Sequence, residues 1–310
     1  MMAEPEINKE EFQFDDIRQE CYIEGTRTVN KKTGGYMQIE IQLESNGAPV
    51  PCNYQYHLSS ALYRILSDHS PELGRSLHDG EAKNRLKLFV FSGLNSDPHP
   101  EFSDTGNGHP SFKFGKRCWM RFASVVPEIV FNMSEALLST GHIQIADARF
   151  KVKKVEMVRQ PEFKPSMVYR PFGQNGMIVC RYNGKTQFPD NSVAGLPDCA
   201  MLLAENLRHK LLRFHEVRPD ILSNYLSVSD LTLDSIRDLK IEVEFLPLKP
   251  DLPFKTGLFE IKDIRQRAFR APFRLTAPEV VHRIAWQCGV GSLNSQGFGL
   301  LTTGKQEEEQ

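Results

Sequence analysis

The sequence predicts an α+β protein built from two halves that repeat one order of elements, β-α-β-β-α-β. Segments of alternating polar and apolar residues, such as 37–43, have the period of a half-buried strand. Other segments, such as 58–66, place apolar residues three and four positions apart, as in a helix with one buried face. The same order of segments occurs in residues 36–160 and again in residues 166–304. A chain of 310 residues is long enough for each half to bury its own core.

In the first half, residues 36–160, a strand at 37–43 precedes a helix around 58–66. Pro127 is expected at the start of a second long helix, because proline at the first helical position loses no hydrogen bond. Residues 95–116 are rich in Pro, Gly, Asp, Ser and Asn, which predicts a long surface loop. The other expected elements are a short helical turn over 71–80 and strands over 86–94, 118–124 and 148–159, with another near Ile143.

The second half, residues 166–304, follows a segment with two prolines, 160–165, that we interpret as a hinge between domains. Its last helix is predicted to begin with a capping box formed by Thr276 and Glu279, and to end at Gly289. Its other elements are strands over 167–170, 240–245, 267–275 and 298–302 and a helix over 198–215. This order of elements, present twice, predicts two tandem ferredoxin-like domains.

The ends of the chain differ from its body in charge. Residues 1–35 are polar and charged and predict an N-terminal arm, and residues 305–310 form an acidic tail. Residues 1–20 hold seven acidic and two basic side chains, although the whole chain has a net charge of only −1. The body is therefore basic, and its surplus lies mainly in 149–170 and 262–283. Clustered basic charge is typical of a surface that binds phosphates, and a solvated face on two strands explains it equally well.

The composition excludes several classes of protein. Hydrophobic residues make up 40% of the chain and charged residues 25%, as in ordinary soluble proteins. No apolar run approaches the roughly 20 residues that a membrane-spanning helix needs, and the acidic N-terminus does not resemble a secretory signal. The six cysteines are scattered without a CxxC pair, which predicts free thiols in the cytoplasm. The histidines show no spacing typical of a metal site, and the sequence predicts neither a metal nor another cofactor.

A loop with four glycines in eleven residues, 289–299, lies between the last helix and the last strand. Glycine allows positive φ and close approach of another backbone, so such a loop suits either phosphate binding or tight packing. The simpler interpretation is a helix C-cap followed by a turn. A dinucleotide fingerprint needs its glycines between a strand and the helix that follows, and a P-loop needs a lysine after them. Neither condition is met here.

Several short motifs, in order along the chain, resemble one known family. They are Tyr54-Gln55-Tyr56, Ser59-Ser60-Ala61-Leu62-Tyr63, Leu77-His78-Asp79, Lys87-Leu88-Phe89, Phe91-Ser92, Val126-Pro127-Glu128-Ile129, Ala268-Phe269-Arg270-Ala271 and the glycine loop, GVGSLNSQGFG. The set resembles the RAMP superfamily of CRISPR-associated proteins, and within it the metal-independent endoribonucleases that cut the repeats of CRISPR precursor transcripts. The resemblance covers roughly residues 36–304 and leaves out the N-terminal arm and the loop at 95–116.

The resemblance implies a cleavage in which the ribose 2′-hydroxyl attacks the adjacent phosphorus. The products are a 2′,3′-cyclic phosphate and a 5′-hydroxyl, and no metal takes part. Some members of the family use a tyrosine, a histidine and a lysine, and their motifs match Tyr63, His78 and Lys87 of this sequence. The resemblance therefore implies that these three residues are catalytic.

The chemistry of the three residue types agrees with these roles and also allows others. His78 has an intrinsic pKa of about 6.5, which suits proton transfer, but a histidine after a short helix is more often a surface residue. Lys87 would stabilise developing phosphorane charge, or else protect an edge strand. Tyr63, with an intrinsic pKa of about 10, would orient the 2′-oxygen or donate a proton, or else belong to the core. His57 is the main competitor of His78, and His69 a weaker one.

The resemblance also implies an RNA partner. We expect basic strands to contact phosphates and the glycine loop to bring backbone N–H groups near the RNA, which fixes register without reading sequence. The expected RNA-binding residues are Lys151, Lys153, Arg267, Arg270, Arg274, Gly289, Gly291, Gly297, Phe298 and Gly299. Other CRISPR-associated proteins and a second copy of the chain are further candidate partners. The alternative function is that of a non-catalytic RAMP-type subunit that holds RNA in an interference complex.

Overall fold

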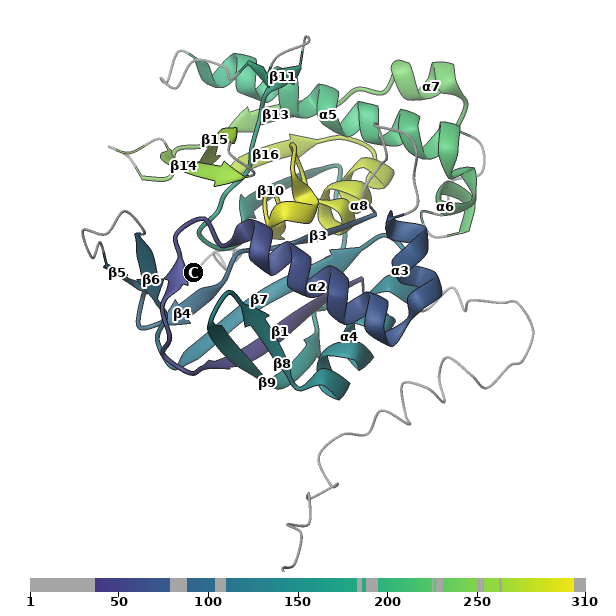
Figure 1. The fold of residues 1–310 in the computed structure, drawn as a ribbon. Helices are drawn as coiled ribbons and strands as arrows, with labels where there is room; N and C mark the ends of the chain where they lie inside the picture. Colours follow the sequence, from purple (N-terminus) through teal and green to yellow (C-terminus); the bar gives the residue numbers. More distant parts are fainter. Residues whose placement is uncertain are drawn as a thin grey trace, which may run out of the picture.

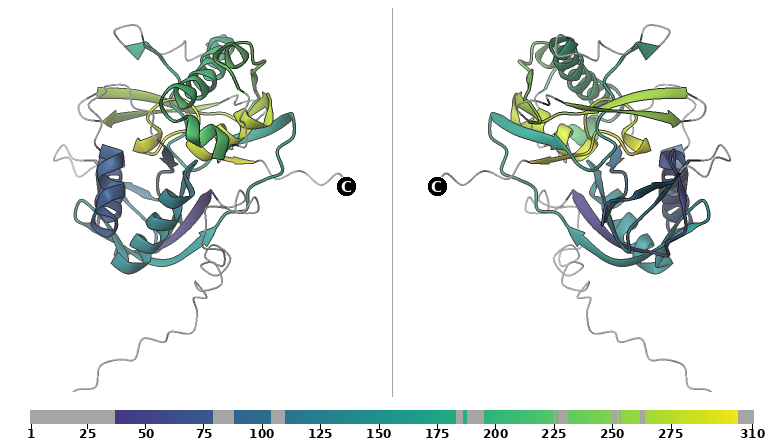
Figure 2. Two further views of the ribbon diagram at one scale, coloured as in Figure 1. Left: turned by 90° about the vertical axis from the view of Figure 1, so that its right-hand side faces the viewer. Right: turned by 90° about the vertical axis from the view of Figure 1, so that its left-hand side faces the viewer.

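The computed structural model describes residues 37–78, 88–103, 110–182, 186–187, 195–224, 226, 231–249, 252, 254–261 and 264–303. The predicted arm and tail lie outside these residues. Two larger antiparallel sheets carry helices, and the described part of the chain is therefore α+β as predicted. Figures 1 and 2 show the N-terminal half below and the C-terminal half above.

The N-terminal half has a six-stranded sheet whose central strand is β1 (Gln38–Ser45). In this strand Ile39 pairs with Phe122 on one side and with Met157 on the other. The helices α2 (Gln55–His69) and α4 (Pro127–Thr140) cover one face, as Figure 1 shows, because each has an apolar stripe to bury. The order is β3 (Phe89–Phe91), β7 (Arg117–Ser124), β1, β9 (Ala148–Met157), β8 (His142–Ile145), with β4 (Asn95–Asp97) also on β7, and α3 (Pro71–His78) follows α2.

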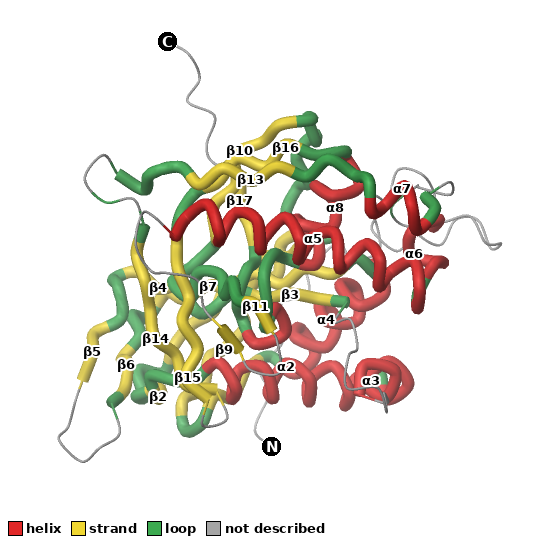
Figure 3. Tube along the Cα trace, turned by 90° about the horizontal axis from the view of Figure 1, so that it is seen from above, coloured by secondary structure: helices red, strands yellow, loops and turns green. Residues whose placement is uncertain are grey.

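The C-terminal half has a four-stranded sheet in the order β13 (Glu242–Phe245), β16 (Phe273–Thr276), β10 (Ser166–Pro171), β17 (Leu301–Thr303). The helices α5 (Leu196–Val217) and α8 (Glu279–Cys288) pack against each other. In Figure 3 α5 crosses the molecule and leads to the shorter helices α6 (Pro219–Asn224) and α7 (Leu233–Arg237).

Helix α8 joins the two halves. It packs against α5 on one side and against β3 and β7 of the N-terminal sheet on the other. Eight of its residues are buried, including His282 and Gln287, as expected for a helix enclosed on all sides. One cluster of buried apolar side chains consequently extends through both halves.

Three smaller sheets were not expected from the sequence. They are the hairpin β14 (Lys255–Ile261) with β15 (Ile264–Arg270), the pair β11 (Arg181–Tyr182) with β12 (Thr186–Gln187), and the sheet β2 (Val50–Pro51), β6 (Ser111–Lys113), β5 (Glu101–Ser103). The last of these, together with β4, corrects the prediction of a long surface loop at 95–116. In β4 Asn95 and Ser96 are buried and pair with Trp119 and Cys118, so main-chain hydrogen bonds stabilise a strand of polar residues.

Two further predictions for the C-terminal half were wrong. The strand expected over 267–275 is two strands, β15 and β16, because Pro272 between them has no N–H to donate to a ladder. The capping box at Thr276 is absent. Its hydroxyl contacts that of Ser166 at 3.0 Å across β10 and β16, the helix N-cap is Pro278, and the Glu279 carboxylate accepts a hydrogen bond from Arg283.

The segment interpreted as a hinge is bound to the C-terminal half at both ends. Gln160 accepts a hydrogen bond from Gln287 at 3.0 Å, and the carbonyl of Pro165 accepts one from the N–H of Ala277 at 2.9 Å.

Among the described residues, no helix is both long enough and apolar enough to cross a membrane.

Candidate active site

The glycine-rich loop is packed between the two halves. Gly289, Gly291, Gly297 and Gly299 all have φ between +69° and +90°, where only glycine is unstrained. A Cβ on Gly291 would overlap the carbonyl oxygen of Ile178, and one on Gly299 would overlap that of Val290. The glycines are therefore required here because other backbone segments lie directly against the loop.

Gly291→Ala is expected to lower the free energy of unfolding by more than about 2 kcal/mol, because it adds a backbone clash to the strain of positive φ. The control is Gly141→Ala. Gly141 has φ +70°, yet a Cβ there would meet nothing within 4 Å, so only the strain of about 1 kcal/mol is expected. Denaturant unfolding of both variants measures the difference, and equal losses would contradict a role in close packing.

The loop's polar groups are bonded within the protein. The N–H groups of Gly291, Gly297 and Gly299 donate to the Asn206 side chain at 2.9 Å, to the Asn294 carbonyl at 3.2 Å and to the Gly176 carbonyl at 2.8 Å. Phe298 is fully buried, and its ring lies 5.0 Å from that of Phe259. These N–H groups therefore have partners within the protein and this ring lies in the core, while contact of the loop with RNA stays a prediction.

A buried lysine holds the start of the loop. Lys210 of α5 is 8% exposed, and its ammonium donates to the Gly289 carbonyl at 2.6 Å, to the Asn294 side chain at 2.8 Å and to the Cys288 carbonyl at 3.4 Å. Burial lowers the pKa of Lys210 to about 8, so the ammonium form still dominates at neutral pH. The charge therefore stabilises the C-terminal carbonyls of α8, which carry the negative end of the helix dipole.

Tyr63 lies where α2, β3 and the glycine loop meet. Its half-buried ring is 5.2 Å from that of Phe89, and its hydroxyl oxygen is buried next to the Ser295 side chain. Burial raises the pKa of Tyr63 to about 12, and the hydrogen bond with Ser295 opposes that rise. The phenol therefore stays protonated at neutral pH and is unsuited to the role of general base. The Tyr63 hydroxyl can instead donate a hydrogen bond, or it can hold the glycine-rich loop in position through Ser295.

Of the other two expected catalytic residues, the structure describes the backbone of His78 and leaves Lys87 outside its described ranges. His78 is the last residue of α3, which packs on α2, but its side chain lies outside what the structure describes. Lys87 lies outside the described residues and directly precedes Leu88, where they resume. Of the competing histidines, His57 is exposed in the first turn of α2, and His69 is exposed 3.5 Å from Glu135.

The expected phosphate-binding side chains are divided between the N-terminal and C-terminal halves. Lys151 and Lys153 are exposed on β9 of the N-terminal half, with the Lys153 ammonium 3.2 Å from Glu44. Arg267 and Arg274 are exposed on β15 and β16, and Arg270 is half-buried. Arg274 pairs with Glu244, and Arg270 donates to Gln174. The five residues belong to three strands, β9, β15 and β16, each in a different sheet.

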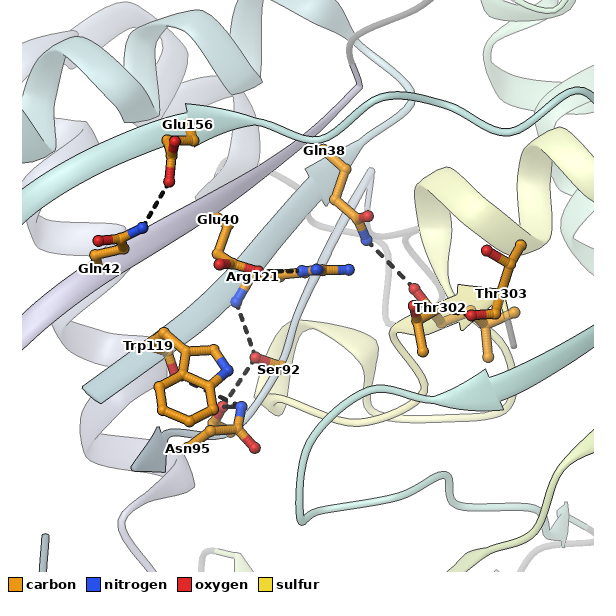
Figure 4. A network of polar contacts seen from close by, with 12 residues as sticks. Gln38, Glu40, Gln42, Ser92, Asn95, Trp119, Arg121, Glu156, Thr302 and Thr303 are labelled. Atoms are coloured by element: carbon orange, nitrogen blue, oxygen red, sulfur yellow. Dashed lines mark hydrogen bonds and ion pairs between the residues drawn. The ribbon is translucent and has the colours of Figure 1, made fainter. Parts of the chain in front are cut away.

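Sequence reasoning missed a polar network between the halves, shown in Figure 4. Arg121 of β7 pairs with Glu40 of β1 at 2.7 Å, and its guanidinium lies 4.1 Å from the centre of the Phe172 ring in the C-terminal half. Gln38 of β1 is fully buried and donates to the Leu301 carbonyl of β17 at 3.5 Å. The sequence offered one sign of Gln38, which is a polar residue at the start of a strand in which polar and apolar residues alternate.

Within the described ranges, no three His, Cys, Asp or Glu side chains are grouped so as to hold a metal ion.

Comparisons with known proteins agree with this architecture. Residues 49–156 match the family described as CRISPR-associated protein Cas6, N-terminal, and residues 177–303 match CRISPR associated protein Cas6, C-terminal. The chain is 24% identical over 269 residues to the CRISPR-associated endoribonuclease Cas6 of Pyrococcus furiosus, covering 84% of this chain and 88% of that protein. It is also 24% identical over 273 residues to CRISPR-associated endoribonuclease Cas6 1 of Methanocaldococcus jannaschii, covering 86% and 92%.

Solved structures show the same fold. A Cas6-related protein from Pyrococcus furiosus superposes with a TM-score of 0.64 at 19% identity, covering 88% of this chain and all of that one. A protein described as an RAMP protein binding different RNA substrates superposes with a TM-score of 0.62 at 17% identity, covering 87% of this chain and all of that one. Because the two family matches cover most of both halves and follow each other in the expected order, the chain belongs to the Cas6 family of CRISPR-associated proteins.

Proposed function

We propose that this protein is an endoribonuclease that cuts CRISPR precursor RNA within its repeats, without a metal ion, by attack of a ribose 2′-hydroxyl. The observation that carries the proposal is the match to both Cas6 families over residues 49–156 and 177–303. Two relatives named as CRISPR-associated endoribonucleases align with 84% and 86% of the chain. The partner that this function requires is repeat RNA, and the scattered cysteines favour a cytoplasmic location.

In the proposed site His78 moves protons and Lys87 balances charge on the phosphorane. Helix α3, which ends at His78, packs on α2, the helix that carries Tyr63. Lys87 is two positions before Phe89 in the sequence, and the Phe89 ring contacts that of Tyr63. Tyr63 completes the set as a hydrogen-bond donor, because its buried phenol keeps its proton.

We further propose that each sheet with its helices is one ferredoxin-like domain, with boundaries at 36–160 and 166–304. In both halves the strand that follows the first helix lies at one end of the sheet, and the first strand pairs with the third and the last. That order, β3-β7-β1-β9 and β13-β16-β10-β17, is the same in the two halves. The exposed basic side chains on β9, β15 and β16 would then contact RNA phosphates from both domains.

The second candidate is a non-catalytic RNA-binding subunit of the same superfamily. It is favoured by the similarity in fold to the RAMP protein binding different RNA substrates and by the burial of the Tyr63 hydroxyl. The endoribonuclease function is better supported than the non-catalytic one, because Tyr63, His78 and Lys87 are all present in the sequence.

Incubation with repeat RNA in excess EDTA separates the two candidates. We expect cleavage at one position per repeat, with an upstream product that ends in a 2′,3′-cyclic phosphate and a downstream product with a 5′-hydroxyl. A duplicate reaction with added Mg²⁺ should proceed at the same rate. Binding without cleavage, measured on the same RNA by gel shift, would favour the non-catalytic subunit.

A further inference from the structure

Ser59 on α2 is bonded to the glycine-rich loop of the other half. Its hydroxyl donates to the Ser295 carbonyl at 2.7 Å and accepts from the Gln296 side chain at 3.0 Å. Ser59 is 2% exposed, so water does not replace either bond. Ser295 and Gln296 belong to the 3-10 turn η3 (Asn294–Gln296) in the middle of the loop.

Ser59 and Tyr63 are four residues apart and therefore lie on one face of α2. Both reach Ser295, since Ser59 binds its carbonyl and Tyr63 contacts its side chain. The turn η3 also packs on β3, where a Cβ on Gly297 would lie 3.1 Å from the Phe91 ring. One turn of the C-terminal half thus touches both N-terminal elements that carry or adjoin the proposed catalytic residues.

The opposite side of the loop is fixed to the C-terminal half. Lys210 and Asn206, one helical turn apart on α5, bind Gly289, Asn294 and Gly291. The Asn294 side chain in turn donates to the carbonyls of Val290 and Phe298 at 3.0 Å and 2.9 Å. The loop is therefore supported from α5 on one side, and the bonds made by Ser59 link it to α2 on the other.

We infer that Ser59 is a positioning residue for RNA cleavage, which aligns α2 and Tyr63 with the C-terminal half through Ser295 and Gln296. The inference rests on the proposed function. Small displacements of catalytic groups by distant mutations cost up to about 100-fold in rate, whereas phosphate contacts elsewhere fix binding. Loss of Ser59 should therefore lower the cleavage rate at saturating RNA and leave affinity unchanged.

Ser59→Ala tests this, with Ser134→Ala as the matched control. Ser134 is equally buried in helix α4, but its hydroxyl donates to Val130 within its own helix. We expect Ser59→Ala to lower the single-turnover rate by about 10-fold or more at saturating RNA, with a Kd within about twofold of wild type. Ser134→Ala should retain both values. Gln296→Ala removes one of the two bonds and should lower the rate less, with no further loss in the Ser59→Ala, Gln296→Ala double variant.

Hydrogen exchange of residues 289–299 gives a readout that does not depend on cleavage. Ser59→Ala should raise exchange there, and Ser134→Ala should not. A Ser59→Ala variant that cleaves at the wild-type rate would overturn the inference, and if that variant does not fold, a wild-type rate for Gln296→Ala does the same. If the wild-type protein does not cleave repeat RNA, the proposed function fails, and unchanged exchange in the variants then overturns the link between Ser59 and the loop.

Discussion

A repeat RNA with a single 2′-deoxyribose at the nucleotide upstream of the cut is expected to bind normally and to remain uncut. The proposed reaction takes its nucleophile from the RNA, so this change removes the attacking oxygen and nothing from the protein. Binding relies on phosphate contacts and on splayed bases, and neither needs that one hydroxyl. The cut position is first mapped on unmodified RNA, and cleavage is then followed at saturating protein.

The matched control places the 2′-deoxyribose one nucleotide further upstream. That RNA should be cut at a rate close to that of the unmodified repeat, since its nucleophile is intact. Cutting of the first substrate would exclude 2′-hydroxyl attack and would point instead to an activated water. A loss of binding for both substrates would show that the protein reads 2′-hydroxyl groups along the strand.

The sequence predicts most clearly those elements that have one buried and one solvated face. Strand β1 and helices α2 and α4 show clear periods because burial selects apolar residues at every second, or every third and fourth, position. The hairpin β14–β15 has no such signal, because Leu258 and Ile264 are exposed on it. Strand β4 is polar and is stabilised by pairing with β7, which composition does not reveal.

The sequence provided candidate catalytic residues, but it did not show the contacts that the glycine-rich loop makes. Four glycines indicate close approach, yet the approaching carbonyl belongs to Ile178, more than a hundred positions away. Lysines are rarely buried, and Lys210 lies within the apolar stripe of α5. Its position in the stripe does not reveal that its ammonium binds the loop. Ser59 lies within the motif that contains Tyr63, and only the fold shows that its hydroxyl faces Ser295.

His78→Ala is expected to lower the cleavage rate by about 100- to 10,000-fold, because a positioned acid or base contributes that much to proton transfer. RNA affinity should change little, since one imidazole adds little to a surface that binds many phosphates. Single-turnover kinetics at saturating protein measure the rate, and a gel shift measures affinity. Added imidazole should restore part of the activity of the variant if the missing group transfers protons.

His57→Ala and His69→Ala are the controls that decide which histidine acts. Both side chains are exposed on α2, the helix before α3, so their removal should leave folding unaffected. We expect both variants to cut RNA at nearly the wild-type rate. A slow His57→Ala variant beside a normal His78→Ala variant would move the proton-transfer role to the first turn of α2. Equal activity of all three variants would mean that no single imidazole carries the reaction, and the proposed mechanism would then need another general acid.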